Sequence, residues 1–106
     1  MIRVKAVKKN GCYSLFESEG HAGFARYGED IVCAAVSALI ITAGNSITEL
    51  TEDEVEIREE DGFVRFEFPA PHSDQTRLLM DALLLGLGQI KEAYGKKYLK
   101  IIVREE

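Results

Sequence analysis

The chain has 106 residues and a formal net charge of −5; 46% of its residues are apolar and 29% are charged. We therefore expect a single globular domain spanning residues 1–106 and exclude a disordered chain. The acidic balance argues against non-specific nucleic-acid binding, which needs a basic surface. The chain starts with alternating charge instead of an apolar leader, its apolar runs fall short of the ~20 residues of a membrane span, and its two cysteines lack a secretory context. These features predict a cytoplasmic protein with free thiols.

The first predicted elements form a β-hairpin. Apolar and polar residues alternate from Ile2 onward, which predicts a half-buried strand, and the pair Asn10-Gly11 predicts a turn into a second strand at residues 12–17. The segment that follows has no hydrophobic periodicity, and we predict a mobile loop at residues 20–28. Its glycines are Gly20, Gly23 and Gly28.

A long helix is predicted to begin at Asp30, whose carboxylate can cap it by accepting an N–H group of the first turn. Residues 31–41 are apolar on nearly every side, so this helix must be covered on more than one face. The pair Gly44-Asn45 is expected to end or kink it. We expect a homodimer to cover the apolar surface that one sheet face cannot.

The second half of the chain repeats the hairpin-then-helix pattern. Alternating residues at 54–58 and 64–68, joined by Asp61-Gly62, predict two strands linked by a type I′ turn. A helix at 74–94 and a last strand at 98–104 complete the order ββαββαβ. Most strands have one polar face, so we predict an α+β fold with a largely antiparallel or mixed sheet and both helices packed on one face.

Cys33 is the candidate nucleophile. It stands in the first turn of the predicted helix, where unpaired N–H groups favour an anion. A free thiol is only about 3% ionised at pH 7, and a helix start supplies roughly 0.3–1 kcal/mol, so the helix alone makes a mildly activated thiol. A competent nucleophile needs a base beside it. From spacing alone, a small buried side chain is the more frequent role of such a cysteine.

His21 is the candidate base, because its glycine-bearing loop leads directly into the Cys33 helix. The rival base, His72, is expected instead to serve the start of the second helix. Ser37 lies one turn after Cys33 on the same helix face. Asp30 can orient the His21 ring as the third member of a triad or can act as the cap alone. The structural alternatives are an exposed loop histidine and a helix serine bonded to a carbonyl of the preceding turn.

We expect neither a metal nor another cofactor. The four candidate ligands lack the close spacing of a structural zinc site; they are Cys12, His21, Cys33 and His72. Gly86-Leu87-Gly88 lies within an apolar helix and matches neither a phosphate-binding loop nor a dinucleotide fingerprint.

The segment from Gly20 to Leu39 resembles the ribosomal-processing cysteine protease family, often called Prp. It contains Gly20-His21-Ala22 and, after a short loop, Tyr27-Gly28-Glu29-Asp30-Ile31-Val32-Cys33-Ala34-Ala35-Val36-Ser37-Ala38-Leu39. The composite pattern His…Gly-x-Asp-x-Val-Cys-Ala-x-x-Ser is specific, and the chain length and predicted element order agree with the family. The resemblance implies that His21 and Cys33 are the catalytic pair, with Asp30 and Ser37 in supporting roles.

The resemblance also implies a cytoplasmic homodimer that removes the N-terminal extension of a large-subunit ribosomal protein, with aromatic residues before the cut and basic residues after it. It implies a peptide substrate, with no membrane and no direct nucleic-acid contact. We further predict that residues 20–28 are disordered or displaced without substrate, and that a bound peptide orders them and brings His21 to Cys33. The alternative function is a non-catalytic dimeric module that binds a ribosomal protein or assembly factor.

Overall fold

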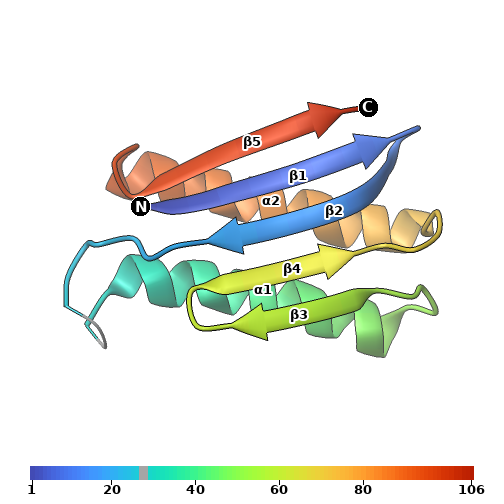
Figure 1. Ribbon diagram of the computed structural model, residues 1–106, viewed down its shortest axis with the longest axis horizontal. Coiled ribbons are helices and arrows are strands. Elements are labelled where there is room, and N and C mark those ends of the chain that lie inside the picture. Colours follow the sequence, from blue (N-terminus) through green and yellow to red (C-terminus); the bar gives the residue numbers. More distant parts are fainter. Residues whose placement is uncertain (27–28) are drawn as a thin grey trace.

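A computed structural model describes residues 1–26 and 29–106, and within them it shows a five-stranded sheet and two helices (Figure 1). In chain order the elements are β1 (Ile2–Lys9), β2 (Cys12–Glu19), α1 (Ile31–Leu50), β3 (Glu56–Glu60), β4 (Phe63–Glu67), α2 (Asp74–Tyr94) and β5 (Leu99–Glu105). The predicted order ββαββαβ is confirmed, and both helices lie on one side of the sheet.

The sheet is mixed, with the strand order β3-β4-β2-β1-β5. The two hairpins pair in the antiparallel sense, and β2 joins them by pairing with β4. β5 runs parallel to β1 at the opposite edge, because α2 carries the chain back across the sheet before β5 begins. This arrangement confirms the predicted α+β fold and shows that the parallel pair lies at the β5 edge.

The core lies between the inner face of the sheet and the two helices. In the sheet, Ala6, Phe16 and Phe66 stand in register on adjacent strands, and the two phenylalanine rings lie 5.4 Å apart. The helices contribute buried side chains at helical spacing, which are Val32, Val36, Ile40, Ile47, Met80, Leu83 and Leu87. Burial of this apolar surface is the main stabilising force, and it sets α1 at a defined height under the sheet.

The prediction that Gly44-Asn45 ends the first helix is wrong. α1 continues to Leu50 and is capped there by Thr51. The glycine instead permits a close approach, because a Cβ at Gly44 would lie 2.9 Å from the ring of Phe66. A glycine inside a helix destabilises it by about 1 kcal/mol, and here it allows α1 to pack closely against the sheet.

Both helices carry apolar residues that the described chain leaves exposed. The expectation that the apolar runs fall short of a membrane span does not hold for α1, which by length and composition alone is long and apolar enough, with a mean hydropathy of 1.8. One-third of this helix is buried, on the faces that contact the sheet and α2. The large aliphatic side chains exposed on the two helices are Ile31, Ile41, Leu50, Leu78 and Leu85. One sheet face and one neighbouring helix thus cover only part of the apolar helix surface.

Candidate active site

Asp30 caps α1, as predicted. Its Oδ1 accepts hydrogen bonds from the N–H groups of Val32 and Cys33, both at 3.0 Å. Its Oδ2 accepts a third from the N–H of Phe24 in the preceding loop, at 3.1 Å. Burial opposes ionisation, but the N–H groups of Cys33, Phe24 and Val32 together lower the pKa of Asp30 below its usual value. The carboxylate therefore fixes both the helix start and the loop before it.

Cys33 is half-buried in the first turn of α1, and its sulfur accepts a hydrogen bond from the N–H of Ala22 at 3.1 Å. Burial raises the pKa of the Cys33 thiol above its usual value, the Ala22 N–H opposes this, and the charge of Asp30 adds to it. The helix start alone predicts a mildly activated thiol, and the fold adds burial and the Asp30 charge, which both favour the neutral form. The N–H groups at a helix start favour an anion, whereas burial and the charge of the capping carboxylate oppose one.

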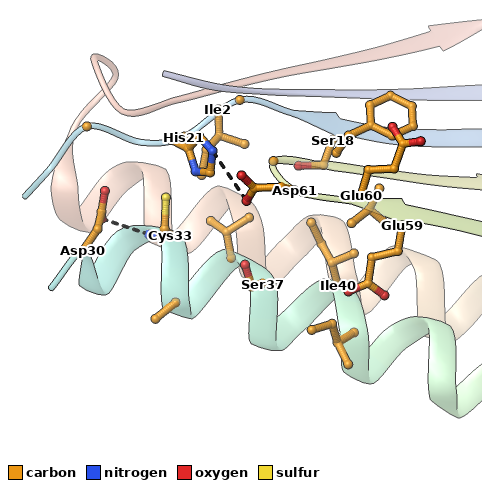
Figure 2. Close-up of a pocket in the computed structure, with 18 of the residues that line it drawn as sticks. Ile2, Ser18, His21, Asp30, Cys33, Ser37, Ile40, Glu59, Glu60 and Asp61 are labelled. Carbon is orange, nitrogen blue, oxygen red and sulfur yellow. Dashed lines mark hydrogen bonds and ion pairs between the residues drawn. The ribbon is translucent and has the colours of Figure 1, made fainter. Parts of the chain in front are cut away.

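His21 lies directly after β2 and borders the same pocket as Cys33 (Figure 2). Its side chain is 53% exposed, and its Nε2 lies 4.0 Å from Oδ1 of Asp61. Its backbone is held nearby, because the His21 carbonyl accepts a 2.6 Å bond from the nitrogen of Met1. The residue before it, Gly20, has φ +97 and would place a Cβ 2.5 Å from the Met1 carbonyl oxygen, so this turn requires glycine.

The shared pocket has a volume of about 940 Å³ and opens between α1, the start of the loop and the β3–β4 hairpin. Ser37 lines it one turn beyond Cys33, as the helical spacing predicts. Apolar side chains of α1 and β4 form its floor, and Glu59, Glu60 and Asp61 place carboxylates along its edge. Such a cavity is large enough for several residues of an extended peptide.

The structure brings together Cys33, His21, Asp30 and Ser37, the four residues predicted from the sequence. Both Asp30 oxygens bond to the backbone N–H groups of the helix start and the loop, and the carboxylate recorded beside the His21 ring is that of Asp61. Sequence reasoning used Asp61 only as a turn residue. Its position in a hairpin turn was visible, but its proximity to a residue 40 positions earlier was not.

The loop at residues 20–28 was predicted to be disordered or displaced without substrate. Gly28 lies outside the described residues, but residues 20–26 have defined contacts that differ from this expectation. Ala22 is buried and bonded to Cys33, Gly23 has φ +73, and Phe24 packs edge-on against Tyr94 and Tyr98. Gating by substrate remains a prediction, and the loop before substrate binding is held by these contacts.

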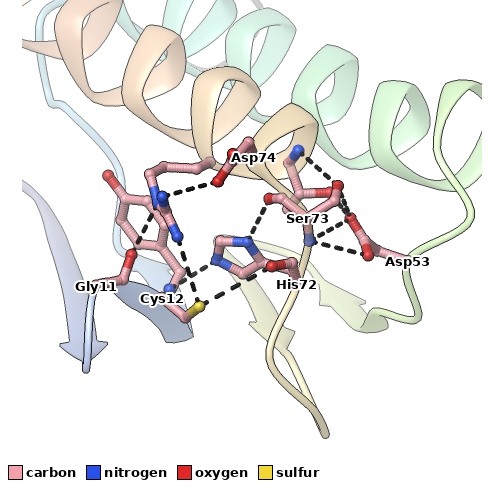
Figure 3. A network of polar contacts seen from close by, with 9 residues as sticks. Gly11, Cys12, Asp53, His72, Ser73 and Asp74 are labelled. Atoms are coloured by element: carbon pink, nitrogen blue, oxygen red, sulfur yellow. Dashed lines mark hydrogen bonds and ion pairs between the residues drawn. The ribbon is translucent and has the colours of Figure 1, made fainter.

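His72 occupies a separate network at the start of α2 (Figure 3). Its Nε2 accepts a 2.8 Å bond from the N–H of Tyr13, and its Nδ1–H donates to the Ser73 carbonyl at 2.8 Å. Ser73 caps α2, and its hydroxyl donates to Asp53 at 2.5 Å. Both ring nitrogens of His72 are thus committed to structure, as expected for the rival base. Within residues 1–26 and 29–106, no group of three or more metal-ligating side chains converges.

A helix-start thiol and an imidazole on one peptide-sized pocket define a hydrolase of the cysteine type. The chain belongs to the cysteine protease Prp family, whose model matches residues 1–100. The Bacillus subtilis ribosomal processing cysteine protease Prp is 36% identical over 85 residues, covering 74% of this chain and 76% of that protein. A Staphylococcus aureus Prp is 32% identical over 80 residues, with the same shares covered.

Solved structures agree with this assignment. The crystal structure of Staphylococcus aureus Prp with a covalently linked product peptide matches with a TM-score of 0.90 and 28% identity, over 97% of this chain and 99% of that one. The same protein with a substrate peptide matches with a TM-score of 0.84 and 26% identity, over the same shares. The chain is therefore a cysteine protease, which decides against the non-catalytic binding module.

Proposed function

We propose that this enzyme cleaves peptide bonds with Cys33 as nucleophile and His21 as general base. The observation that carries this is their placement on one open pocket, with the sulfur at the start of α1. The thiol proton moves to the imidazole, and the thiolate attacks the scissile carbonyl carbon. The imidazolium then protonates the leaving amine, and water hydrolyses the resulting thioester. Asp30 supports the reaction by fixing the helix start, and Ser37 borders the attack site.

The substrate we propose is the N-terminal extension of a large-subunit ribosomal protein. Two observations support it beside the family's name for its members. The Staphylococcus aureus relative was crystallised with substrate and product peptides. The pocket edge of this chain carries Glu59, Glu60 and Asp61, which suits a basic peptide by charge complementarity. The cleaved bond would lie near Cys33, with basic residues toward the acidic edge.

We also propose substrate gating of the site. A thiol with a raised pKa is a poor nucleophile at rest, and the Ala22 N–H sits on the Cys33 sulfur. A bound peptide would exclude water from the pocket and bring the His21 ring closer to the sulfur, so that a proton transfer that is weak at rest becomes efficient. An enzyme of this kind stays nearly inactive toward unintended chains in the cytoplasm, where we place it.

We propose that the enzyme is a homodimer through the exposed apolar faces of α1 and α2. Ile31, Ile41, Leu78 and Leu85 are 46–70% exposed, and Leu50 is 74% exposed. Several large apolar side chains exposed on two neighbouring helices are typical of an interaction site. Sedimentation of the wild type against Leu78→Glu and Leu85→Glu variants tests this, since a monomeric wild type would contradict it.

The proposed function is tested by mass spectrometry of a recombinant ribosomal protein that carries its N-terminal extension. Wild-type enzyme should release the extension, and Cys33→Ala should leave it intact while remaining folded, because a methyl group preserves the helix and removes the sulfur. Cys12→Ala is the matched control, since Cys12 lies in the network at the start of α2, and it should cleave normally. Full cleavage by Cys33→Ala would overturn the assignment.

A further inference from the structure

The tip of the β3–β4 hairpin lies against the ring of His21. Gly62 accepts a 2.8 Å hydrogen bond at its carbonyl from the N–H of Gly20, which ties the tip to the residue before His21. Gly62 has φ +69, and a Cβ there would lie 2.8 Å from Nε2 of His21. The carboxylate of Asp61 lies 4.0 Å from the same nitrogen. The hairpin tip therefore acts on the imidazole in three ways: its backbone is bonded to Gly20, Gly62 leaves space for the ring, and Asp61 places a negative charge near Nε2.

We propose that Asp61 and Gly62 form the positioning platform of His21, a role that rests on the proposed function of His21 as base. Gly62 leaves the space that the ring occupies. Asp61 faces Nε2, which places the N–H of the neutral ring there and leaves Nδ1 to accept the proton from Cys33. When the S–H bond breaks and the Nδ1–H bond forms, the ring becomes positive, and the Asp61 carboxylate stabilises that charge.

Two other carboxylates of the pocket have different partners. Asp30 is committed to backbone N–H groups, and its charge opposes the Cys33 thiolate. Glu60 accepts a hydrogen bond from Arg58 at 3.2 Å. Asp61 lies at ion-pair distance from the His21 ring, with its Oδ1 4.0 Å from Nε2. Because the Asp61 side chain is 84% exposed, water and salt screen the pair, so we expect a several-fold effect and not a collapse of activity.

The direction of the effect separates this role from a general effect of charge. A negative charge acting directly on Cys33 opposes its thiolate, so removing that charge would speed alkylation by iodoacetamide. A charge acting through His21 supports proton transfer, so Asp61→Asn should slow alkylation of Cys33 by roughly two- to fivefold at low salt. Glu59→Gln removes the same charge from the same pocket edge and should not slow it. Cys12 provides an internal reference in each digest.

A double-mutant cycle completes the test. In a His21→Ala background, Asp61→Asn should leave alkylation unchanged or speed it, because the residue through which Asp61 acts is gone. In the cleavage assay Asp61→Asn should lower kcat and Glu59→Gln should not, while both raise KM to a similar extent because both carboxylates lie on the acidic edge of the pocket. Asp61→Glu should restore most of kcat, and high salt should bring the kcat of the wild type toward that of Asp61→Asn. Alkylation does not depend on cleavage, so the cycle tests the platform even if the proposed substrate is wrong. Unchanged or faster alkylation in Asp61→Asn, or equal slowing without His21, would overturn the proposal.

Discussion

Asp30→Asn separates the structural role of this carboxylate from a catalytic one. An asparagine Oδ1 can keep both bonds from the helix start, and asparagine caps helices about as well as aspartate. The variant loses the charge at the N-terminus of α1, worth about 0.3–1 kcal/mol. It also loses the acceptor for the Phe24 N–H, an exposed bond at the low end of about 0.5–1.5 kcal/mol. We therefore expect the free energy of unfolding to fall by about 1 kcal/mol.

The pH dependence of this loss follows from the lowered pKa of Asp30. A carboxyl group whose pKa is lower in the folded protein stabilises it above the unfolded value of about 3.9, and that contribution disappears as the pH falls through the folded value. Urea unfolding should show the full difference between wild type and Asp30→Asn near pH 7. The difference should begin to shrink as the pH falls below about 4 and should disappear only once the pH is below the folded pKa of Asp30. A difference that grows in acid would contradict the assigned role.

The same variant tests the thiol. Because the Asp30 charge adds to the burial that raises the pKa of Cys33, Asp30→Asn should lower that pKa and speed alkylation at neutral pH. Cleavage should fall far less than the roughly 10⁴-fold loss that follows replacement of a triad aspartate by asparagine. Slower alkylation together with a loss of cleavage of that size would refute the cap reading and establish Asp30 as the group that orients His21.

Two further changes test the loop and the helix packing. Phe24→Ala removes a ring that packs edge-on against two tyrosines at centroid distances of 5.6 and 5.2 Å; hydrogen exchange at the Ala22 amide should speed up, with unfolding free energy reduced by about 1 kcal/mol. Unchanged exchange would show that this ring does not hold the loop. Gly44→Ala should destabilise the protein by about 1 kcal/mol, since its Cβ would lie 2.9 Å from a β4 phenylalanine ring, whereas Gly88→Ala meets no described neighbour within 4 Å and should stabilise it by up to about 1 kcal/mol. Thermal unfolding of both variants compares them, and shifts of the same sign would contradict the packing argument.

Local patterns in the sequence determined the elements and the reactive residues. Alternation, turn pairs and the cap at Asp30 predicted the order ββαββαβ and the start of α1, and both are confirmed. These features depend on hydrogen bonds and periodicities within a few residues, so they can be predicted from the sequence without knowing the tertiary structure. The position of Cys33 in the first helical turn could be predicted for the same reason.

Tertiary structure decided what depends on contacts between distant segments. The strand order sets β5 parallel to β1, and it sets the Asp61-Gly62 turn beside His21. From the sequence alone Gly44 indicates a helix end, and only the structure shows that it makes room for the ring of Phe66. The pKa of the resting Cys33 thiol also depends on the fold, because the burial that raises it is a property of the folded chain and not of the helix position alone. Secondary-structure propensity acts over a few residues, whereas packing and desolvation depend on contacts between segments that are distant in the sequence. The surroundings of His21 and Cys33 are set by such contacts, so they became known only with the tertiary structure.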